Sequence, residues 1–295
     1  MSEGNTYLLD PEAEGEMIRL ARQGRLITQA VGLFPPNVNP LVLPSVQAAD
    51  EPRGSYVLDI GCATGEWALE LASKFRQFQV FGIDISERMI AYASKQAENQ
   101  ELAATTHFQV ANALHVLPFP DNYFDLIHIR VAVGFIPRDR WVDVFRECWR
   151  ILRPQGILIS TEGEAGITTY ENPATATINK WLVEALWVSG LGFWDGVGSA
   201  HGIHAMQPVF FQRVGYRNVE FFPWMAYNSY GSPQYQAWLD HLKITVQATE
   251  PLICGALHVP KEEFQAKLEE SVMEARLDRY QCYTTFLTLT GQKIL

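Results

Sequence analysis

The chain has few cysteines, no excess of basic residues and no long apolar run. Its four cysteines, spread over 295 residues, form no C-x-x-C pair, which argues against a zinc site or a disulfide framework. Lysine and arginine total 23 against 33 acidic residues, for a formal net charge of −10. Because no Lys/Arg cluster offsets this acidity, we expect neither duplex nucleic acid nor an anionic membrane as a main partner.

Two targeting signals are also missing. The N-terminus lacks the basic and then apolar pattern of a signal peptide, and no apolar run approaches the roughly 18 residues of a membrane-spanning helix. We therefore expect a cytoplasmic protein. The length suffices for a full core, either in one elaborated α/β domain or in a domain with an appended subdomain.

A glycine-rich turn at 61–65 follows a short apolar run at 57–60 and precedes an amphipathic segment that starts at Trp67. This order predicts a strand, a tight turn and a helix. Glycine at positions 61 and 65 would let the backbone approach a ligand closely at the helix N-terminus. Taken alone, the stretch also fits an ordinary turn between a strand and a helix.

A second predicted strand, residues 79–84, ends in Asp84, roughly 20 residues after the turn. A doubly wound fold presents a carboxylate at this place to ribose hydroxyls. The glycine spacing is Asp59-x-Gly61-x-x-x-Gly65 rather than G-x-G-x-x-G, so the cradle for a dinucleotide pyrophosphate is absent. The two features together predict a nucleoside ligand that is not a dinucleotide.

The run from Val57 to Gly65, followed by Asp84, resembles motif I and its acidic partner in the class I S-adenosylmethionine-dependent methyltransferases. The resemblance continues through most of residues 55–162 and implies S-adenosylmethionine as the cofactor. In the family, the motif I glycines pass the methionine part and the acid holds the ribose. By position, the resemblance implies cofactor binding by Asp59, Gly61, Gly65, Asp84, Ile85, Met89, Asn112, Ala113 and Arg130.

Two of these positions need comment. Asn112 precedes Ala113 where the family usually has Asp-Ala; an amide oxygen can still accept from the adenine amino group, without charge assistance. Arg130 ends a strand that resembles the family's fourth. There it would face the ligand crevice and bind a carboxylate of cofactor or substrate.

The resemblance implies an α/β fold, a doubly wound, mostly parallel sheet of seven strands (Rossmann-like) with a helical cap and lid. We expect a cap helix and linker over residues 1–50, the cofactor-binding core over 51–165, and the remaining strands with helical lid insertions over 166–295. The predicted insertion is a pair of helices near 233–253 and 260–277, which would build the lid together with a helix near 174–189.

The segment before the core carries helix start signals. Asp10 is placed to cap a helix over residues 11–32 with Pro11 at its first position. We expect this helix to cover the cofactor mouth, with Arg25 reaching the methionine carboxylate and Tyr7 closing over the pocket. A solvated arginine and a packed tyrosine are the alternatives. The helix, or the lid, would also be the contact of a homo-oligomer.

Most tryptophans lie in the second half of the chain. Many of them must be core, yet their density suits an apolar or aromatic substrate. A phenol or enol acceptor must lose a proton, and the candidate bases are Glu162, Glu164, His201 and His204. His201 and His204 stand at helical spacing, but no third metal ligand has a convincing spacing, so we expect no metal.

The predicted function is methyl transfer from S-adenosylmethionine to oxygen, nitrogen or carbon of a small, largely apolar metabolite of natural-product type. A macromolecular substrate is disfavoured, because the sequence lacks an N-P-P-[YFW] tetrad, a catalytic Pro-Cys pair and a basic face. A cofactor-binding protein of the same fold that does not methylate, such as a cyclase or a scaffold, stays open.

Overall fold

The computed structural model describes residues 14–40, 43, 54–198 and 200–294. One sheet of eight strands runs through the molecule in the order β3-β2-β1-β4-β5-β8-β6, and β7 also pairs with β8. The strands are β1 (Tyr56–Ile60), β2 (Gln79–Asp84), β3 (Thr106–Val110), β4 (Phe124–Arg130), β5 (Leu152–Gly163), β6 (Ile167–Thr168), β7 (Arg217–Tyr227) and β8 (Cys282–Gln292).

The first five strands pair in parallel, and β8 runs antiparallel to both β5 and β7. In β4 every residue but Arg130 is buried, as expected for a parallel strand covered on both faces. The predicted doubly wound, mostly parallel α/β fold is confirmed. The short strand β6 is an addition that the sequence did not indicate.

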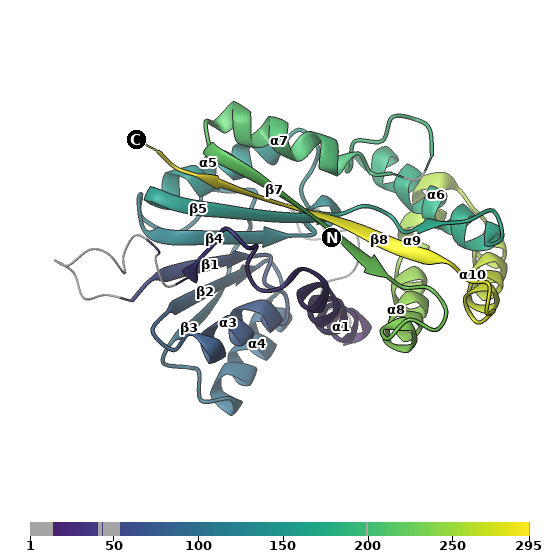
Figure 1. The fold of residues 1–295 in the computed structure, drawn as a ribbon, viewed down its shortest axis with the longest axis horizontal. Helices are drawn as coiled ribbons and strands as arrows, with labels where there is room; N and C mark the ends of the chain where they lie inside the picture. Colours follow the sequence, from purple (N-terminus) through teal and green to yellow (C-terminus); the bar gives the residue numbers. More distant parts are fainter. Residues whose placement is uncertain (1–13, 41–42, 44–53, 199, 295) are drawn as a thin grey trace.

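Helices cover both faces of the sheet and one of its ends (Figure 1). They are α1 (Glu14–Val31), α3 (Glu66–Lys74), α4 (Glu87–Asn99), the 3-10 helix η2 (Ala132–Gly134), α5 (Trp141–Ile151), α6 (Pro173–Val188), α7 (Ile203–Val214), α8 (Tyr235–Ala248), α9 (Glu250–Leu257) and α10 (Lys261–Ala275). The segment predicted as one helix over 233–253 forms two, because Pro251 stands in the first turn of α9 and cannot continue α8.

Two separate apolar clusters hold the helices to the sheet. One contains Trp67 and Leu71 of α3, and the other contains Phe145 of α5 and Phe211 of α7. Since the clusters share no buried residue, they belong to the two faces of the sheet. The carboxyl ends of the parallel strands are left for other elements to cover.

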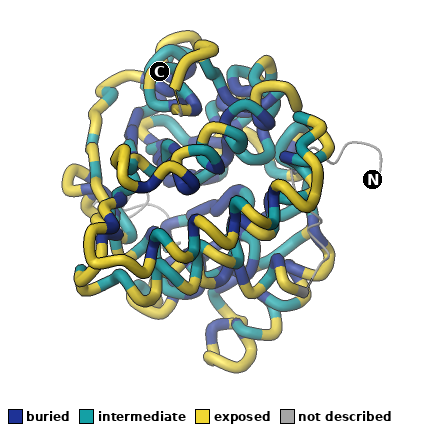
Figure 2. Tube along the Cα trace, turned by 90° about the vertical axis from the view of Figure 1, so that its right-hand side faces the viewer, coloured by how far each residue is buried: buried dark blue, intermediate teal, exposed yellow. Residues whose placement is uncertain are grey.

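Helices α6, α8, α9 and α10 gather beyond these strand ends (Figure 1) and have a core of their own, which includes Ile178, Phe264 and Leu268. We call these four helices the lid. The N-terminus of α6 is capped by Glu274 of α10, whose carboxylate accepts from the backbone amides of Ala174 and Thr175. In Figure 2, seen from the lid side, buried segments lie inward and exposed ones outward.

Helix α1 lies between the core and the lid (Figure 1). Its Ile27 and Val31 pack against Phe286 of β8, and the helix also contacts α8. The predicted start signals at Asp10 and Pro11, and Tyr7, fall outside the described residues. The position of α1 confines the space at the strand ends.

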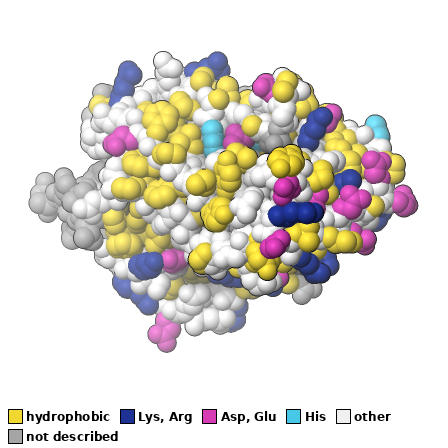
Figure 3. All heavy atoms as spheres, turned by 45° about the vertical axis from the view of Figure 1, so that its right-hand side comes forward, with side chains coloured by type: hydrophobic (Ala, Val, Ile, Leu, Met, Phe, Trp, Pro, Cys, Tyr) yellow, Lys and Arg dark blue, Asp and Glu magenta, His cyan; other side chains and the backbone are white. Residues whose placement is uncertain are grey.

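The surface carries mixed charges. On the face shown in Figure 3, basic and acidic side chains are interspersed among apolar ones. Within the described ranges, none of the helices has the length and apolar character needed to cross a bilayer. The same residues bring together no group of three His, Cys, Asp or Glu side chains suited to a metal ion.

Candidate active site

A cavity of about 390 Å³ opens at the carboxyl ends of the parallel strands, between the core, α1 and the lid. This volume is within the usual range for small-molecule sites. On the core side it is lined by Asp59, Gly61, Cys62, Ala63, Thr64, Glu66, Asp84, Ile85, Met89, Asn112, Ala113 and Arg130, among others. On the side of α1 and the lid, the lining includes Arg19, Leu20, Gln23, Leu182, Leu186, Trp238, His241 and Thr245.

Asp84 ends β2 with its carboxylate held by the backbone. One oxygen accepts from the amide of Ala63 at 2.9 Å and the other from the amide of Ser86 at 3.0 Å. Enclosure by the protein raises the pKa of this carboxyl, and the two amides oppose that rise. The carboxylate is therefore fixed in orientation at the cavity wall, as the sequence predicted for a ribose ligand.

The two motif glycines have different surroundings. Gly61 lines the cavity with φ +68°, and a Cβ there would lie 3.0 Å from the Phe135 ring. Gly65, with φ +79°, caps α3, and its Cβ would lie 3.0 Å from Ala93 and Phe108. Gly61 thus permits close approach at the cavity, whereas Gly65 permits close packing of α3, and it does not line the cavity.

Asp59 is held by a histidine that the sequence did not single out. Its Oδ1 lies 2.8 Å from Nδ1 of the buried His128, whose ring stacks on Trp67 at 3.9 Å between centroids. Burial lowers the pKa of His128, which favours a neutral ring donating to Asp59. The partners sit on adjacent strands, β1 and β4, in register, so only the sheet pairing brings them together.

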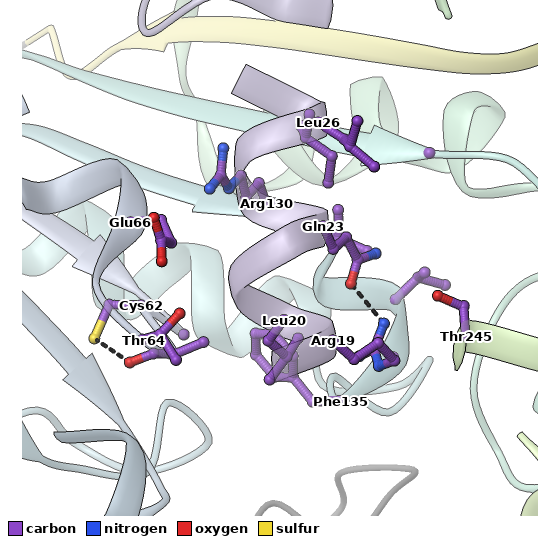
Figure 4. Close-up of a pocket in the computed structure, with 18 of the residues that line it drawn as sticks. Arg19, Leu20, Gln23, Leu26, Cys62, Thr64, Glu66, Arg130, Phe135 and Thr245 are labelled. Carbon is purple, nitrogen blue, oxygen red and sulfur yellow. Dashed lines mark hydrogen bonds between the residues drawn. The ribbon is translucent and has the colours of Figure 1, made fainter. Parts of the chain in front are cut away.

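Arg130 joins the core to α1. Its guanidinium donates to Oγ1 of Thr28 at 2.9 Å, and a Cβ on Gly24 would lie 3.2 Å from it. Figure 4 shows Arg130 and Glu66 on the core side of α1. Arg25 is directed to Glu66 at 3.1 Å with more than half of its side chain exposed, and it does not line the cavity.

The expected adenine contacts lie together at the ends of β2 and β3. Ile85, Met89, Asn112 and Ala113 all line the cavity. The amide oxygen of Asn112 accepts from the backbone amide of Leu114 at 2.9 Å. That bond orients the side chain, and a carbonyl oxygen has a second lone pair for a ligand.

Two of the four candidate bases lie on the cavity wall. Glu164, just past β5, accepts from the backbone amides of His201 and His204, so it caps the N-terminus of α7. The His201 ring lines the cavity with Nδ1 3.2 Å from the Gly163 carbonyl. Because a carbonyl only accepts, Nδ1 carries the proton. Burial lowers the pKa of His201, with Glu164 opposing.

The other two candidates face away from the cavity. The buried Glu162 carboxylate accepts from the backbone amides of Ala132 and Val133 at 2.8 and 3.1 Å, and His204 Nε2 pairs with the Glu162 carbonyl at 3.0 Å. Neither residue lines the cavity. Glu162 holds η2 and its cavity-lining neighbours in place, so its contacts support a structural role.

Glu162 should make stability depend on pH. Burial raises its pKa from 4.5 to about 8, so the folded chain binds a proton more tightly than the unfolded chain does. Its stabilising contribution is fully present below pH 4.5 and is lost as pH rises through 8. We expect the melting temperature to fall more between pH 6 and pH 8 in the wild type than in Glu162→Gln. Equal falls in thermal denaturation would contradict this assignment.

Several cavity residues were not predicted. Arg19 and Gln23 of α1 and His241 and Thr245 of α8 come from segments that the sequence marked only as cap and lid. Figure 4 places Arg19 and Gln23 on one side and Thr245 on the other. For α1, the sequence signal that could have found them is the helical spacing of the polar residues Glu16, Arg19 and Gln23.

Part of the chain is similar in sequence to known methyltransferases. Residues 57–156 match the family model described as a methyltransferase domain. The chain is 30% identical over 119 residues to demethylmenaquinone methyltransferase of Bacillus licheniformis, covering 40% of this chain and 49% of the relative. It is 37% identical over 105 residues to 27-O-demethylrifamycin SV methyltransferase of Amycolatopsis mediterranei, covering 36% and 37%. The chain thus spans half or less of these relatives.

Two solved structures share the fold. The (4+2)-cyclase SpnF matches with a TM-score of 0.51 at 20% identity, over 100% of this chain and 89% of that one. A candidate methyltransferase of Bacillus halodurans matches with a TM-score of 0.51 at 17% identity, over 84% and 96%. At these identities the likeness concerns the fold alone, and it extends beyond the matched domain into the second half of the chain.

Proposed function

We propose that this chain, whose residues 57–156 form a domain of the class I S-adenosylmethionine-dependent methyltransferases, methylates a small, largely apolar molecule. The observation that carries the proposal is that the motif I turn, the Asp84 carboxylate and the apolar lid all line the same cavity. A cofactor and an acceptor can meet in one cavity there.

The residues present fit S-adenosylmethionine. Asp84 offers a backbone-anchored carboxylate for two vicinal hydroxyls, and Ile85 and Met89 offer apolar surface for a flat base. Asp59, fixed by His128, is placed on the core wall for a cationic amino group. Gly61 leaves the backbone open beside them.

The strand order separates the two ligands. Asp84 ends β2, and Glu164 follows β5, three strands away in the sheet, which corresponds to roughly 14 Å at about 4.8 Å per strand. The cofactor would extend from β2 toward β4, and the acceptor would lie between β5 and the lid. Glu164 and His201 are then the ionisable side chains at the β5 end of the acceptor's side, whereas Arg19 and His241 lie at its lid end.

When bound, the cofactor supplies a methyl group that is already activated for transfer. The chain's task is therefore to hold the acceptor in line and to exclude water. Helix α1 and the lid perform the exclusion, because they close the cavity opposite the strand ends. For an acceptor that must lose a proton, the proposal keeps Glu164 and His201 and leaves out Glu162 and His204.

The proposal is tested by incubating the purified chain with S-adenosylmethionine and a broad panel of naphthols, quinols, macrolactones and amines. We expect S-adenosylhomocysteine to accumulate with at least one small molecule, together with the methylated product by mass spectrometry. The Asp84→Ala chain is the matched negative control. Turnover on a polypeptide or polynucleotide, with none on small molecules, would refute the substrate class.

A second outcome separates catalysis from mere binding. Calorimetry that shows tight S-adenosylmethionine binding, with no transfer to any acceptor, would favour a non-methylating protein of the same fold. In that case the molecules that co-purify in the cavity, read by native mass spectrometry, would identify the reaction to be sought.

A further inference from the structure

We propose that the lid end of the cavity is a subsite for a neutral oxygen, a hydroxyl or a carbonyl, on the part of the acceptor remote from the methylated atom. This inference rests on the proposed function, because it names what the same cavity selects. Gln23 of α1 and Thr245 of α8 form the subsite, and both line the cavity.

Gln23 is held in one orientation. Its Oε1 accepts from the Arg19 guanidinium at 2.7 Å, so its Nε2, which only donates, is turned away from Arg19. Figure 4 shows the amide nitrogen of Gln23 on the side of the lid. The side chain therefore presents a hydrogen-bond donor to the cavity.

Thr245 supplies the opposite wall. Helices α1 and α8 contact each other, and the Thr245 hydroxyl lies 3.0 Å from Nε2 of His241. A hydroxyl can donate as well as accept. An oxygen placed between the two helices would thus have partners on both sides.

Among the described residues, Arg19 is the charged side chain of α1 that lines the subsite, whereas Arg22 is exposed and does not line the cavity. Arg19 donates twice to the buried Glu16 carboxylate, at 2.7 Å each. Burial, with Arg19 and Arg22 nearby, lowers the pKa of His241 to about 4, so its ring is neutral at pH 7. A carboxylate brought here would lose its hydration and meet a lining cation, Arg19, that is already paired with Glu16, whereas a neutral oxygen loses less hydration.

Between this subsite and the core the lining is mostly apolar, although Asn228, Gln234, Thr249 and Thr284 also line the cavity. Leu20, Leu182, Leu186, Trp238 and Phe286 all face the cavity. The acceptor that fits has an apolar body. One end of this body lies at the core, and the other end carries a neutral oxygen. Acceptors with an acid at the far end are excluded by the same argument.

The test compares three probes of one shape, 2-naphthol, 2,6-dihydroxynaphthalene and 6-hydroxy-2-naphthoic acid, by calorimetry on the full chain saturated with S-adenosylhomocysteine. The diol should bind about two- to tenfold more tightly than 2-naphthol, as one added neutral hydrogen bond allows. The acid should bind more weakly than 2-naphthol. Equal binding of the diol and 2-naphthol, or tightest binding of the acid, would overturn the subsite.

Variants of Gln23 and Thr245 test whether these side chains cause the tighter binding of the diol. Gln23→Glu keeps an acceptor for Arg19 but removes the donor, and Thr245→Val removes the hydroxyl at constant shape. Each should abolish the advantage of the diol while leaving 2-naphthol binding within about twofold. Gln29→Leu, on the exposed side of the same helix, is the control and should preserve the advantage. A diol advantage that survives both cavity variants would assign it elsewhere.

Different outcomes would refute the proposed function and the subsite. It is refuted if the chain does not bind S-adenosylmethionine or transfers no methyl group, and the three probes can then still be compared on the chain without cofactor. If transfer occurs and the probes bind alike, only the subsite is wrong.

Discussion

Replacing Asp84 with alanine should weaken S-adenosylmethionine binding by about tenfold or more, the largest loss expected from any single side chain. The carboxylate is the acceptor placed for the ribose diol, and hydrogen bonds to a charged group contribute about 1.5–3 kcal/mol. The same change also removes the acceptors of the Ala63 and Ser86 amides, which loosens the motif I turn. Isothermal titration calorimetry measures the loss directly.

Two further variants serve as controls for that experiment. Asp84→Asn keeps one acceptor for the backbone and loses the charge, so its affinity should lie between those of the wild type and alanine chains. Glu87→Ala removes the same charge three residues away on the exposed first turn of α4 and should change affinity by less than about twofold. Unchanged affinity in both Asp84 variants, or a preference for NAD, would contradict the assignment of S-adenosylmethionine as the cofactor.

Deleting residues 1–32 should leave a cooperatively folding core that has lost at least about tenfold in cofactor affinity and most of its turnover. The two clusters that hold the sheet contain no residue of α1, so the sheet should still unfold in one transition. The cavity, however, would lose the wall that carries Leu20, Gln23 and Ile27 and would open to water. Thermal denaturation and calorimetry report the two effects separately.

A point change tests the same contact without shortening the chain. In Gly24→Leu a side chain would enter where a Cβ is already 3.2 Å from Arg130 and 3.3 Å from Glu66, so either α1 or these two side chains must shift. Its effect cannot come from a weaker helix, because leucine favours helix over glycine. We expect affinity to fall in Gly24→Leu as well.

Arg25→Ala is the matched mild change on the same helix. The exposed ion pair of Arg25 with Glu66 should contribute little, so the affinity loss should stay under about fivefold. If the truncated chain binds and methylates as well as the full one, the role of α1 is structural only. A large loss in Arg25→Ala would instead restore its direct role at the cofactor.

Local sequence was sufficient for the core of this protein. The apolar run at 57–60, the glycine turn and the acid at Asp84 lie within one strand-turn-helix-strand unit, where neighbours in sequence are neighbours in space. For that reason the position of Asp84 at the end of β2 could be predicted from spacing, while the parallel fold was predicted from the resemblance to the class I methyltransferases.

The candidate bases show the limit of the same reasoning. Glu162 and Glu164 stand two residues apart at the end of β5, and periodicity alone would give them the same face. The structure separates them, because Glu162 turns to the amides of η2 and Glu164 to those of α7. Which carboxylate meets the cavity is decided by the backbone that each can reach.

Several contacts around the cavity were determined only by tertiary structure. His128 reaches Asp59 through the pairing of β1 with β4, and Gln23 and Thr245 line the same cavity because α1 packs on α8, more than 200 positions later in the chain. No local pattern encodes such contacts, since they arise when separate apolar surfaces are buried together. The sequence by itself determined the parallel core and the position of Asp84, while the packing of α1 and the lid on that core decided which other side chains line the cavity.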